Sequence, residues 1–432
     1  MRDPLGSITI TETKVHRTLY QALPLNHLLY NKVAMEMVKH RELIAFEFVN
    51  DKEIISPRIP FVSYPYEWCN AQFMDAAKLT LSISEQALTA GCELKDASAW
   101  NVIFDGCKPI FCDHLSFQTI SRKQWWAFAQ FVKHFVLPLC IAKYRHLNAN
   151  NSFKINHDGL SPDHAQTLMG LKRFLTRYWL LMLKPRLNGI AEKTKIIQEP
   201  CSHHKNLYVM TRWFLSGVSQ LHQRKSTWIN YTEDRNHYSK KASLTKYQMV
   251  QEWLTTLKPN WVTDLGCNTG EFSKLAARLG AKVVAIDLDH ESIQDIYLSN
   301  QGEPIYPVVA NLEDIAGGRG WSGDEFPSLL TRLESHADLV LMLALIHHLA
   351  ISSSVPYDDI AKIANRLSKR YLIVEMVDAT DPLVQRLAGQ HDRHSKEFSI
   401  TRQQESFGQH FKTLEDFVIP ESGRHLVLME KR

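Results

Sequence analysis

A strand, a glycine-bearing turn and a helix follow one another in Trp261-Val-Thr-Asp-Leu-Gly-Cys-Asn-Thr-Gly270-Glu-Phe-Ser-Lys-Leu-Ala-Ala-Arg-Leu-Gly280. Gly266 and Gly270 let the backbone approach a ligand where a Cβ would clash, and the helix offers unpaired N–H groups at its start. Asp264 precedes the first glycine by two positions, and the apolar strand 283–287 ends at Asp287. A strand-end carboxylate can accept hydrogen bonds from ribose hydroxyls. The pattern predicts a nucleoside-type cofactor.

The spacing of the turn distinguishes between cofactors. A dinucleotide site requires G-x-G-x-x-G, which seats a pyrophosphate on the helix N-terminus. Here the spacing is Gly266-x-Asn268-x-Gly270, and Asp264 would bring negative charge close to that anion. S-adenosylmethionine carries an ammonium and a sulfonium instead, which a carboxylate attracts. Asn268 tolerates left-handed backbone angles.

These residues resemble the first motif of class I S-adenosylmethionine-dependent methyltransferases, (Asp/Glu)-x-Gly-x-Gly-x-Gly, with Asn268 in place of the central glycine. The resemblance implies that Asp287 binds the ribose, that Leu288 lies against the adenine, and that Asn311 and Leu312 meet the adenine edge. It also implies that the methionine moiety is lined by Asp264, Gly266, Cys267, Asn268 and Gly270. The alternative is an ordinary strand-turn-helix unit.

The composition indicates an ordinary globular protein. A length of 432 residues favours two domains, and the net charge of +4 does not by itself imply nucleic acid. We place an accessory α+β domain at 1–225 and the cofactor domain at 226–432. Seven scattered cysteines form no CxxC pair and indicate free thiols without a metal site. The chain begins without the apolar run of a signal peptide, so we expect a cytoplasmic protein without a transmembrane segment.

From residue 243 onward, helix and strand patterns alternate. Ser243 is expected to cap a helix that turns one face inward, formed by Leu244, Tyr247, Val250, Leu254 and Leu257. Unbroken apolar runs follow at 261–264, 282–287, 305–310, 338–345 and 371–377, and two further strands at 413–419 and 424–430. Such runs indicate strands buried on both faces. We therefore predict an α/β, Rossmann-like domain with a mostly parallel seven-stranded sheet.

Candidate catalytic residues stand at the ends of two of these strands. His347 and His348 are expected to end the fourth strand, where the methyl group should point in this fold, and an imidazole could remove a proton from an acceptor. Glu375, at the end of the fifth strand, is a second candidate. A capping or packing role for a histidine is the alternative, and we predict no metal site.

The first half has strand patterns at 8–20 and 43–56 and a long helix at 71–90. Asp96, Asn101 and Asp113 then follow in a loop, a hairpin and a strand end that resemble the catalytic and metal-binding loops of protein-kinase-like phosphotransferases. The glycine-rich phosphate loop and a clear Val-Ala-Ile-Lys strand are missing from the sequence. The alternative is a small α+β domain in which Asp96 and Asn101 brace a turn.

A basic and aromatic cluster, Lys172-Arg-Phe-Leu-Thr-Arg-Tyr-Trp179, gives no clear nucleic-acid signal. A helix with Leu171, Phe174, Tyr178, Leu181 and Met182 inward explains it.

Several segments together resemble a bacterial family of two-part methyltransferases, the nodulation protein NoeA-like family. They are residues 59–68, 94–104, 124–131, 264–270 and 343–349. We therefore expect an S-adenosylmethionine-dependent methyltransferase that acts on a small-molecule or glycan-type acceptor, at oxygen. The alternatives are a bifunctional kinase-methyltransferase and a non-catalytic scaffold with a cofactor pocket. The acceptor and the oligomeric state stay open.

Overall fold

The computed structural model describes residues 4–120, 125–182, 200–219, 239–390 and 398–432. The chain separates into two compact units, Met1–Gln223 and Arg224–Arg432. The domain boundary predicted at 225/226 lies outside the described residues.

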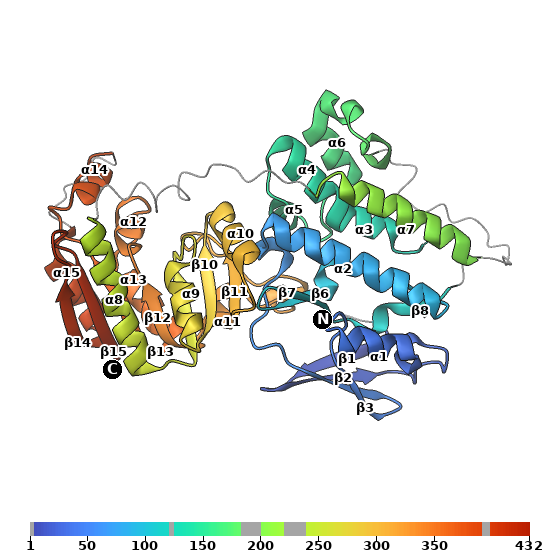
Figure 1. Cartoon of the computed structure of the whole chain (residues 1–432), viewed down its shortest axis with the longest axis horizontal. Helices are drawn as coiled ribbons and strands as arrows, with labels where there is room; N and C mark the ends of the chain where they lie inside the picture. The colour runs from blue at the N-terminus through green and yellow to red at the C-terminus, as the bar shows by residue number, and fades with distance from the viewer. Residues whose placement is uncertain (1–3, 121–124, 183–199, 220–238, 391–397) are drawn as a thin grey trace. The chain divides into compact units, whose positions relative to one another are not determined.

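The described part of the second unit contains a seven-stranded sheet in the order β11-β10-β9-β12-β13-β15-β14 (Figure 1). Its strands are β9 (Trp261–Leu265), β10 (Lys282–Asp287), β11 (Ile305–Val309), β12 (Ala337–Met342), β13 (Ser368–Met376), β14 (Phe411–Val418) and β15 (His425–Lys431). The strands from β11 to β13 pair in parallel, and β15 runs antiparallel to both of its neighbours. The predicted mostly parallel, seven-stranded sheet is confirmed.

The chain order reverses at β9, which has β10 on one side and β12 on the other. The connections diverge to opposite sides at such a point, and ligands of α/β sheets bind outside the carboxyl ends of the strands there. The loops after β9, β10 and β12 therefore share one edge of the sheet. The glycine turn, Asp287 at the end of β10, and α12 (Ile346–Ile351) with the two histidines follow in that order along the chain.

Helices alternate with these strands along the chain. They are α8 (Lys240–Leu257), α9 (Glu271–Arg278), α10 (His290–Ser299), η10 (Trp321–Gly323), α11 (Leu329–Leu333), α12 (Ile346–Ile351), α13 (Tyr357–Leu367), α14 (Pro382–Gln390) and α15 (Ile400–Gly408). Of these helices, α9, α10, α12, α13 and α15 pack against the sheet. In α13, Ile360, Ala361, Ala364 and Leu367 are buried. Asp358 and Asp359 lie in the first turn of this helix and Arg366 lies in its last turn, as the helix dipole favours.

The prediction for α8 was wrong about the residue that caps the helix and about one residue of its inward face. Ser239, and not Ser243, caps the helix, because its Oγ accepts a hydrogen bond from the N–H of Ala242 at 3.1 Å. Leu244 is exposed, while Lys246 is buried with Val250 and Leu254. A buried lysine is tolerated there because Glu375 neutralises it.

The first unit begins with an antiparallel sheet in the order β1-β2-β4-β3, followed by a long helix. The strands are β1 (Gly6–Ile10), β2 (Lys14–Leu19), β3 (Glu47–Asn50) and β4 (Glu53–Pro57), and η1 (Leu28–Tyr30) and α1 (Lys32–Lys39) lie between β2 and β3 in the chain. The long helix α2 (Asn70–Thr89) buries Phe73, Ala77, Ile83 and Ala87. The strand-rich stretches and the long helix predicted here are confirmed.

Two further strand pairs follow in the first unit, one local and one between more distant segments. A hairpin is formed by β6 (Val102–Asp105) and β7 (Lys108–Phe111), and β5 (Cys92–Leu94) pairs with β8 (Phe117–Thr119). The 3-10 turns near them are η2 (Pro65–Glu67), η3 (Ala99–Asn101) and η4 (His114–Ser116). The later elements of the described part of this unit are helices: α3 (Phe128–Phe131), η5 (Val132–Val136), α4 (Leu137–Arg145), α5 (Asn150–Ile155), α6 (Pro162–Met169), η6 (Gly170–Leu175), η7 (Trp179–Met182) and α7 (Pro200–Ser216).

The helix expected around residues 171–182 is not formed. Two short 3-10 helices, η6 and η7, occupy the segment, and Leu171 and Phe174 are 82% and 57% exposed. A 3-10 helix has three residues per turn, so side chains spaced for an α-helix do not share one face. Tyr178, Leu181 and Met182 are buried as expected.

No helix in the described ranges is long and apolar enough to cross a membrane.

Candidate active site

The glycine turn after β9 adopts the strained backbone that its sequence predicts. Gly266, Asn268 and Gly270 have φ values of 71°, 49° and 77°. Glycine takes such angles at little cost, and asparagine is among the side chains that tolerate them best. A Cβ on Gly270 would lie 2.8 Å from Ile296 Cγ1, and one on Gly266 would lie 3.0 Å from Leu345 Cδ1. The turn is therefore closely packed as well as bent.

Asp264 is buried below this turn. Its Oδ2 accepts a hydrogen bond of 2.6 Å from the hydroxyl of Ser273 on α9. Burial raises the pKa of the Asp264 carboxyl to about 6, although the Ser273 hydrogen bond acts in the opposite direction. Asp264 therefore orders the turn and supplies a negative charge when ionised. Ser273 was not predicted, although it is the third residue of the helix that follows the turn.

Asp287 links the ends of β9 and β10. Its Oδ2 accepts from the N–H of Asn268 at 2.8 Å, and its Oδ1 accepts from the N–H of Asp289 at 2.8 Å. Each carboxylate oxygen keeps a second lone pair, so the group has capacity for two hydroxyl donors. Burial raises the pKa of this carboxyl. Leu288 is next to it and 54% exposed, which leaves an apolar side chain available to cover a flat base.

Asn311 and Leu312 follow β11 directly. Val309 is the register partner of Asp287, so both residues lie at the same edge as the ribose candidate. The Asn311 Oδ1 accepts from the N–H of Glu313 at 3.1 Å, and both side chains are half-buried. Cys267 is buried, and burial raises the pKa of its thiol well above the ordinary value.

From the sequence, the two histidines are expected at the end of the fourth strand. They lie instead in the first turn of α12. Strand β12 ends at Met342, and Ala344 then takes a left-handed φ of 53° before the helix begins. The turn redirects the chain, so that His347 is fully buried while His348 is half-buried. The centroids of the two rings are 4.3 Å apart.

His347 is enclosed without a hydrogen-bond partner on either ring nitrogen among the described residues. Burial lowers the pKa of His347 well below its ordinary value, and His348, Arg424 and Lys246 act in the same direction. The pKa of His348 is lowered to about 4, again mainly by burial. Both imidazoles are therefore neutral at pH 7, and each has a nitrogen lone pair that can accept a proton.

Glu375 lies at the end of β13 in a buried chain of charges. Its Oε2 is bonded to Lys246 Nζ, and its Oε1 accepts from Arg424 Nη1 at 3.0 Å. Both carboxylate oxygens are thus paired with cations, which favours a positioning role over proton transfer. Lys246 and Arg424 were not predicted, because no local pattern marks a residue whose partner is more than 40 positions away.

The residues of this site fit S-adenosylmethionine. The turn has the strained angles that a close approach of a ligand requires, and two carboxylates lie beside it for a cationic, ribose-bearing molecule. The described residues contain no group of three or more His, Cys, Asp or Glu side chains that could hold a metal.

Comparison with known families decides the assignment. Residues 237–414 match the family model described as a methyltransferase domain. This protein is an S-adenosylmethionine-dependent methyltransferase.

One curated relative spans the whole chain. It is the nodulation protein NoeA of Rhizobium meliloti (strain 1021), which is 26% identical over 462 residues and covers 100% of this chain and 95% of that protein.

Two solved structures are each similar to less than half of this chain. Magnesium protoporphyrin IX methyltransferase (ChlM) from Synechocystis PCC 6803 with bound SAH is 15% identical, with a TM-score of 0.32 over 44% of this chain and 84% of that one. The bifunctional kinase-methyltransferase WbdD is 18% identical, with a TM-score of 0.33 over 47% of this chain and 41% of that one.

A second cluster lies in the first unit, where the fold brings Asp96, Asn101 and Asp113 together. Ser116 Oγ donates to Asp113 Oδ2 at 2.5 Å, and Asn101 Nδ2 donates to Ser116 Oγ at 3.0 Å. Arg17 on β2 pairs with Asp113 at 3.1 Å. The pKa of Asp96 is raised by burial and by the charge of Asp113.

The same contacts also brace local turns. The Asp96 Oδ1 accepts from the N–H of Ser98 at 3.0 Å, and Asn101 donates to the carbonyl of Asp96 at 3.3 Å. The turn-bracing role given above as the alternative is thus present, whether or not the cluster binds a ligand.

Proposed function

We propose that the second unit methylates an oxygen of a small-molecule or glycan-type acceptor, with His347 as the catalytic base. The observation that carries this proposal is the fully buried, neutral His347, whose ring has no hydrogen-bond partner within the described part of the chain. Its helix, α12, follows β12 at the edge of the sheet where ligands of this fold bind, and His347 interacts electrostatically with Glu375 and Arg424. A buried imidazole without a partner is costly, and an acceptor hydroxyl would supply the missing hydrogen bond.

The chemistry follows from these positions. When bound, S-adenosylmethionine supplies an electrophilic methyl group on a sulfonium. Transfer of that methyl group to the acceptor oxygen would release the hydroxyl proton, and a neutral nitrogen of His347 would accept it. In-line displacement mainly requires alignment and the exclusion of water, and enclosure of His347 serves both. The negative charge of Glu375 favours the imidazolium that forms.

We place the cofactor on the turn and the two strand ends. In this arrangement Asp287 would accept hydrogen bonds from the ribose hydroxyls, Leu288 would cover the base, and Asn311 and Leu312 would lie at its edge. The methionine moiety is assigned to the backbone from Gly266 to Gly270, above Asp264. The accessory unit would bind or present the acceptor.

The test is incubation of the protein with labelled S-adenosylmethionine and fractions of cell extract, followed by mass identification of the labelled product. We expect an O-methylated product that disappears with His347→Ala while cofactor binding, measured by calorimetry, is unchanged. An N-methylated product, or full activity of His347→Ala, would contradict the proposal. Arg366→Ala, which removes an exposed ion pair with Glu334, is the matched control.

A second candidate is a bifunctional kinase-methyltransferase, and the convergence of Asp96, Asn101 and Asp113 favours it. In that case Asn101 and Asp113 would hold Mg²⁺ on the phosphates of a nucleotide, and Arg17 would neutralise Asp113 in its absence. Mg-ATP turnover by the full chain that Asp113→Asn abolishes would support this function. Absence of nucleotide binding to the full chain would exclude it.

A further inference from the structure

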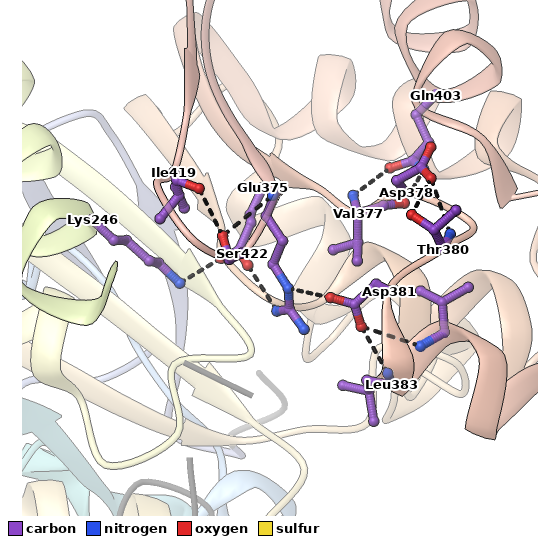
Figure 2. Close-up of polar contacts among 12 residues, drawn as sticks. Lys246, Glu375, Val377, Asp378, Thr380, Asp381, Leu383, Gln403, Ile419 and Ser422 are labelled. Atoms are coloured by element: carbon purple, nitrogen blue, oxygen red, sulfur yellow. Dashed lines mark hydrogen bonds and ion pairs between the residues drawn. The ribbon is translucent and has the colours of Figure 1, made fainter. Parts of the chain in front are cut away.

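Four charged side chains from distant parts of the chain form one continuous buried network in the second unit. Figure 2 shows Lys246, Glu375 and Asp381 along this line of polar contacts. Arg424 connects the two carboxylates: its Nη1 donates to Glu375 Oε1 at 3.0 Å and its Nε donates to Asp381 Oδ2 at 2.9 Å. All four residues are buried.

The network ties together four different elements. Lys246 belongs to α8, Glu375 to β13, and Arg424 precedes β15. Asp381 caps α14, because its Oδ1 accepts from the N–H of Leu383 at 2.8 Å. A shift of any one of these elements would break an ion pair in a place where water cannot replace it.

The geometry of Arg424 depends on its guanidinium. Two different nitrogens of one rigid plane are bonded to two different carboxylates, which fixes the end of β13 against the start of α14. A lysine carries the same charge but a single point donor, so it cannot hold both carboxylates in this arrangement. Two hydrogen bonds also fix the backbone of Arg424. Its N–H donates to Ser422 Oγ at 3.3 Å, and its carbonyl accepts from the N–H of Ile419 at 2.8 Å.

Buried ion pairs seldom stabilise a protein more than apolar side chains of similar size would, because each ion loses its water. The position of the network suggests another role. Helix α12, which carries His347 and His348, packs against β13 and α14, two of the elements that the network joins. His347 interacts electrostatically with Glu375 on β13, with Arg424 before β15 and with Lys246 on α8.

We propose that Arg424 is a positioning residue for methyl transfer, which orients Glu375 and the start of α14 around His347 without touching the cofactor. This inference rests on the proposed function of His347. It predicts that Arg424 acts on the reaction through the carboxylate of Glu375, and that its removal leaves the cofactor turn intact.

The two partners have opposite electrostatic effects on His347. Arg424 opposes protonation of this imidazole, and Glu375 favours it. His347 must be neutral to accept a proton, so the rate of methyl transfer falls as the pH drops through the pKa of His347. Arg424→Gln should therefore move the acidic limb of the pH–rate profile to higher pH, and Glu375→Gln should move it to lower pH. Loss of packing alone would not produce shifts in opposite directions.

The experiment uses the full-length protein, labelled S-adenosylmethionine and the extract fraction that the wild type methylates. We expect Arg424→Lys to lower kcat about 100-fold, because displacement of a reacting group by about 1 Å has an effect of that size. The calorimetric Kd for S-adenosylmethionine should stay within twofold of the wild type. Arg366→Lys, at an exposed pair with Glu334, is the matched control.

Wild-type kcat and an unshifted pH profile in Arg424→Lys and Arg424→Gln would overturn the inference, as would equal losses of activity and cofactor affinity. If the Arg424 variants do not fold, Glu375→Gln replaces them in the test. The acidic limb of its pH–rate profile should move to lower pH, and an unshifted limb would overturn the inference. An active His347→Ala would instead refute the proposed function, so the two failures are distinguishable.

Discussion

Ser273 and Asp264 are joined by a hydrogen bond of 2.6 Å between Oγ and Oδ2, which ties the first turn of α9 to the end of β9. The carboxyl is buried and its pKa is raised to about 6, against an ordinary value of 3.8. A proton therefore stays on the native protein at a pH where the unfolded chain has released it.

The sign of the pH dependence follows from that difference. Between about pH 4 and pH 6 the native state binds more protons at Asp264 than the unfolded state, so this residue's contribution to the free energy of unfolding falls as the pH rises. We expect the difference between the wild type and Asp264→Asn to change by about 3 kcal/mol across this window. Urea unfolding at pH 4, 5, 6 and 7 measures it. A flat difference would contradict the raised pKa.

Asp287 is predicted to determine the affinity for S-adenosylmethionine. Asp287→Ala removes the acceptors for the ribose and also the two turn hydrogen bonds from Asn268 and Asp289. Hydrogen bonds to charged groups contribute about 1.5–3 kcal/mol each, so the Kd should rise at least about tenfold. Calorimetry measures this change.

Asp287→Asn separates the two roles in this prediction. It keeps one oxygen acceptor and the approximate shape, so its loss of affinity should be intermediate. An unchanged Kd for S-adenosylmethionine in both variants would show that Asp287 does not bind the ribose.

Gly270→Ala should destabilise the second unit more than Gly280→Ala. Both glycines have positive φ, at 77° and 101°, and share the cost of forcing alanine into that region. Only at Gly270 would the new Cβ meet another atom, Ile296 Cγ1, at 2.8 Å. Ile296 is fully buried and cannot move aside freely. We expect an additional loss of about 1–3 kcal/mol in the free energy of unfolding, measured by denaturant titration. Equal losses would show that the turn relaxes.

Thiol reactivity should follow burial. The pKa values of the Cys140 and Cys112 thiols are raised to about 12 by burial, and burial also raises that of Cys267 well above its ordinary value. The thiolate is the reactive form, so these cysteines should alkylate slowly. Among the cysteines of the described ranges, we expect Cys107, which is half-buried, to react with iodoacetamide before Cys267, which is buried. Peptide mass mapping over time measures the order, and early labelling of Cys267 would show that the turn opens.

Much of the second unit is predictable from local sequence. Strand β10 and helix α2 were located within one residue at their ends, because apolar runs and helical periodicity report burial directly. Asn268 was expected to tolerate left-handed angles and has a φ of 49°. In contrast, the segment around Phe174 has apolar side chains at helical spacing but forms 3-10 turns, since neighbouring structure overrides a short periodic pattern.

The sequence alone determined the cofactor class, because the turn from Asp264 to Gly270 and the carboxylate of Asp287 are local features whose spacing reflects the shape of one ligand. The tertiary structure alone determined the surroundings of His347. Lys246, Glu375, Asp381 and Arg424 are spread over nearly 180 positions and meet only after the sheet has formed. Local patterns encode backbone shape, whereas a buried charge is tolerated only where a distant partner neutralises it, so the network could not be predicted from the sequence.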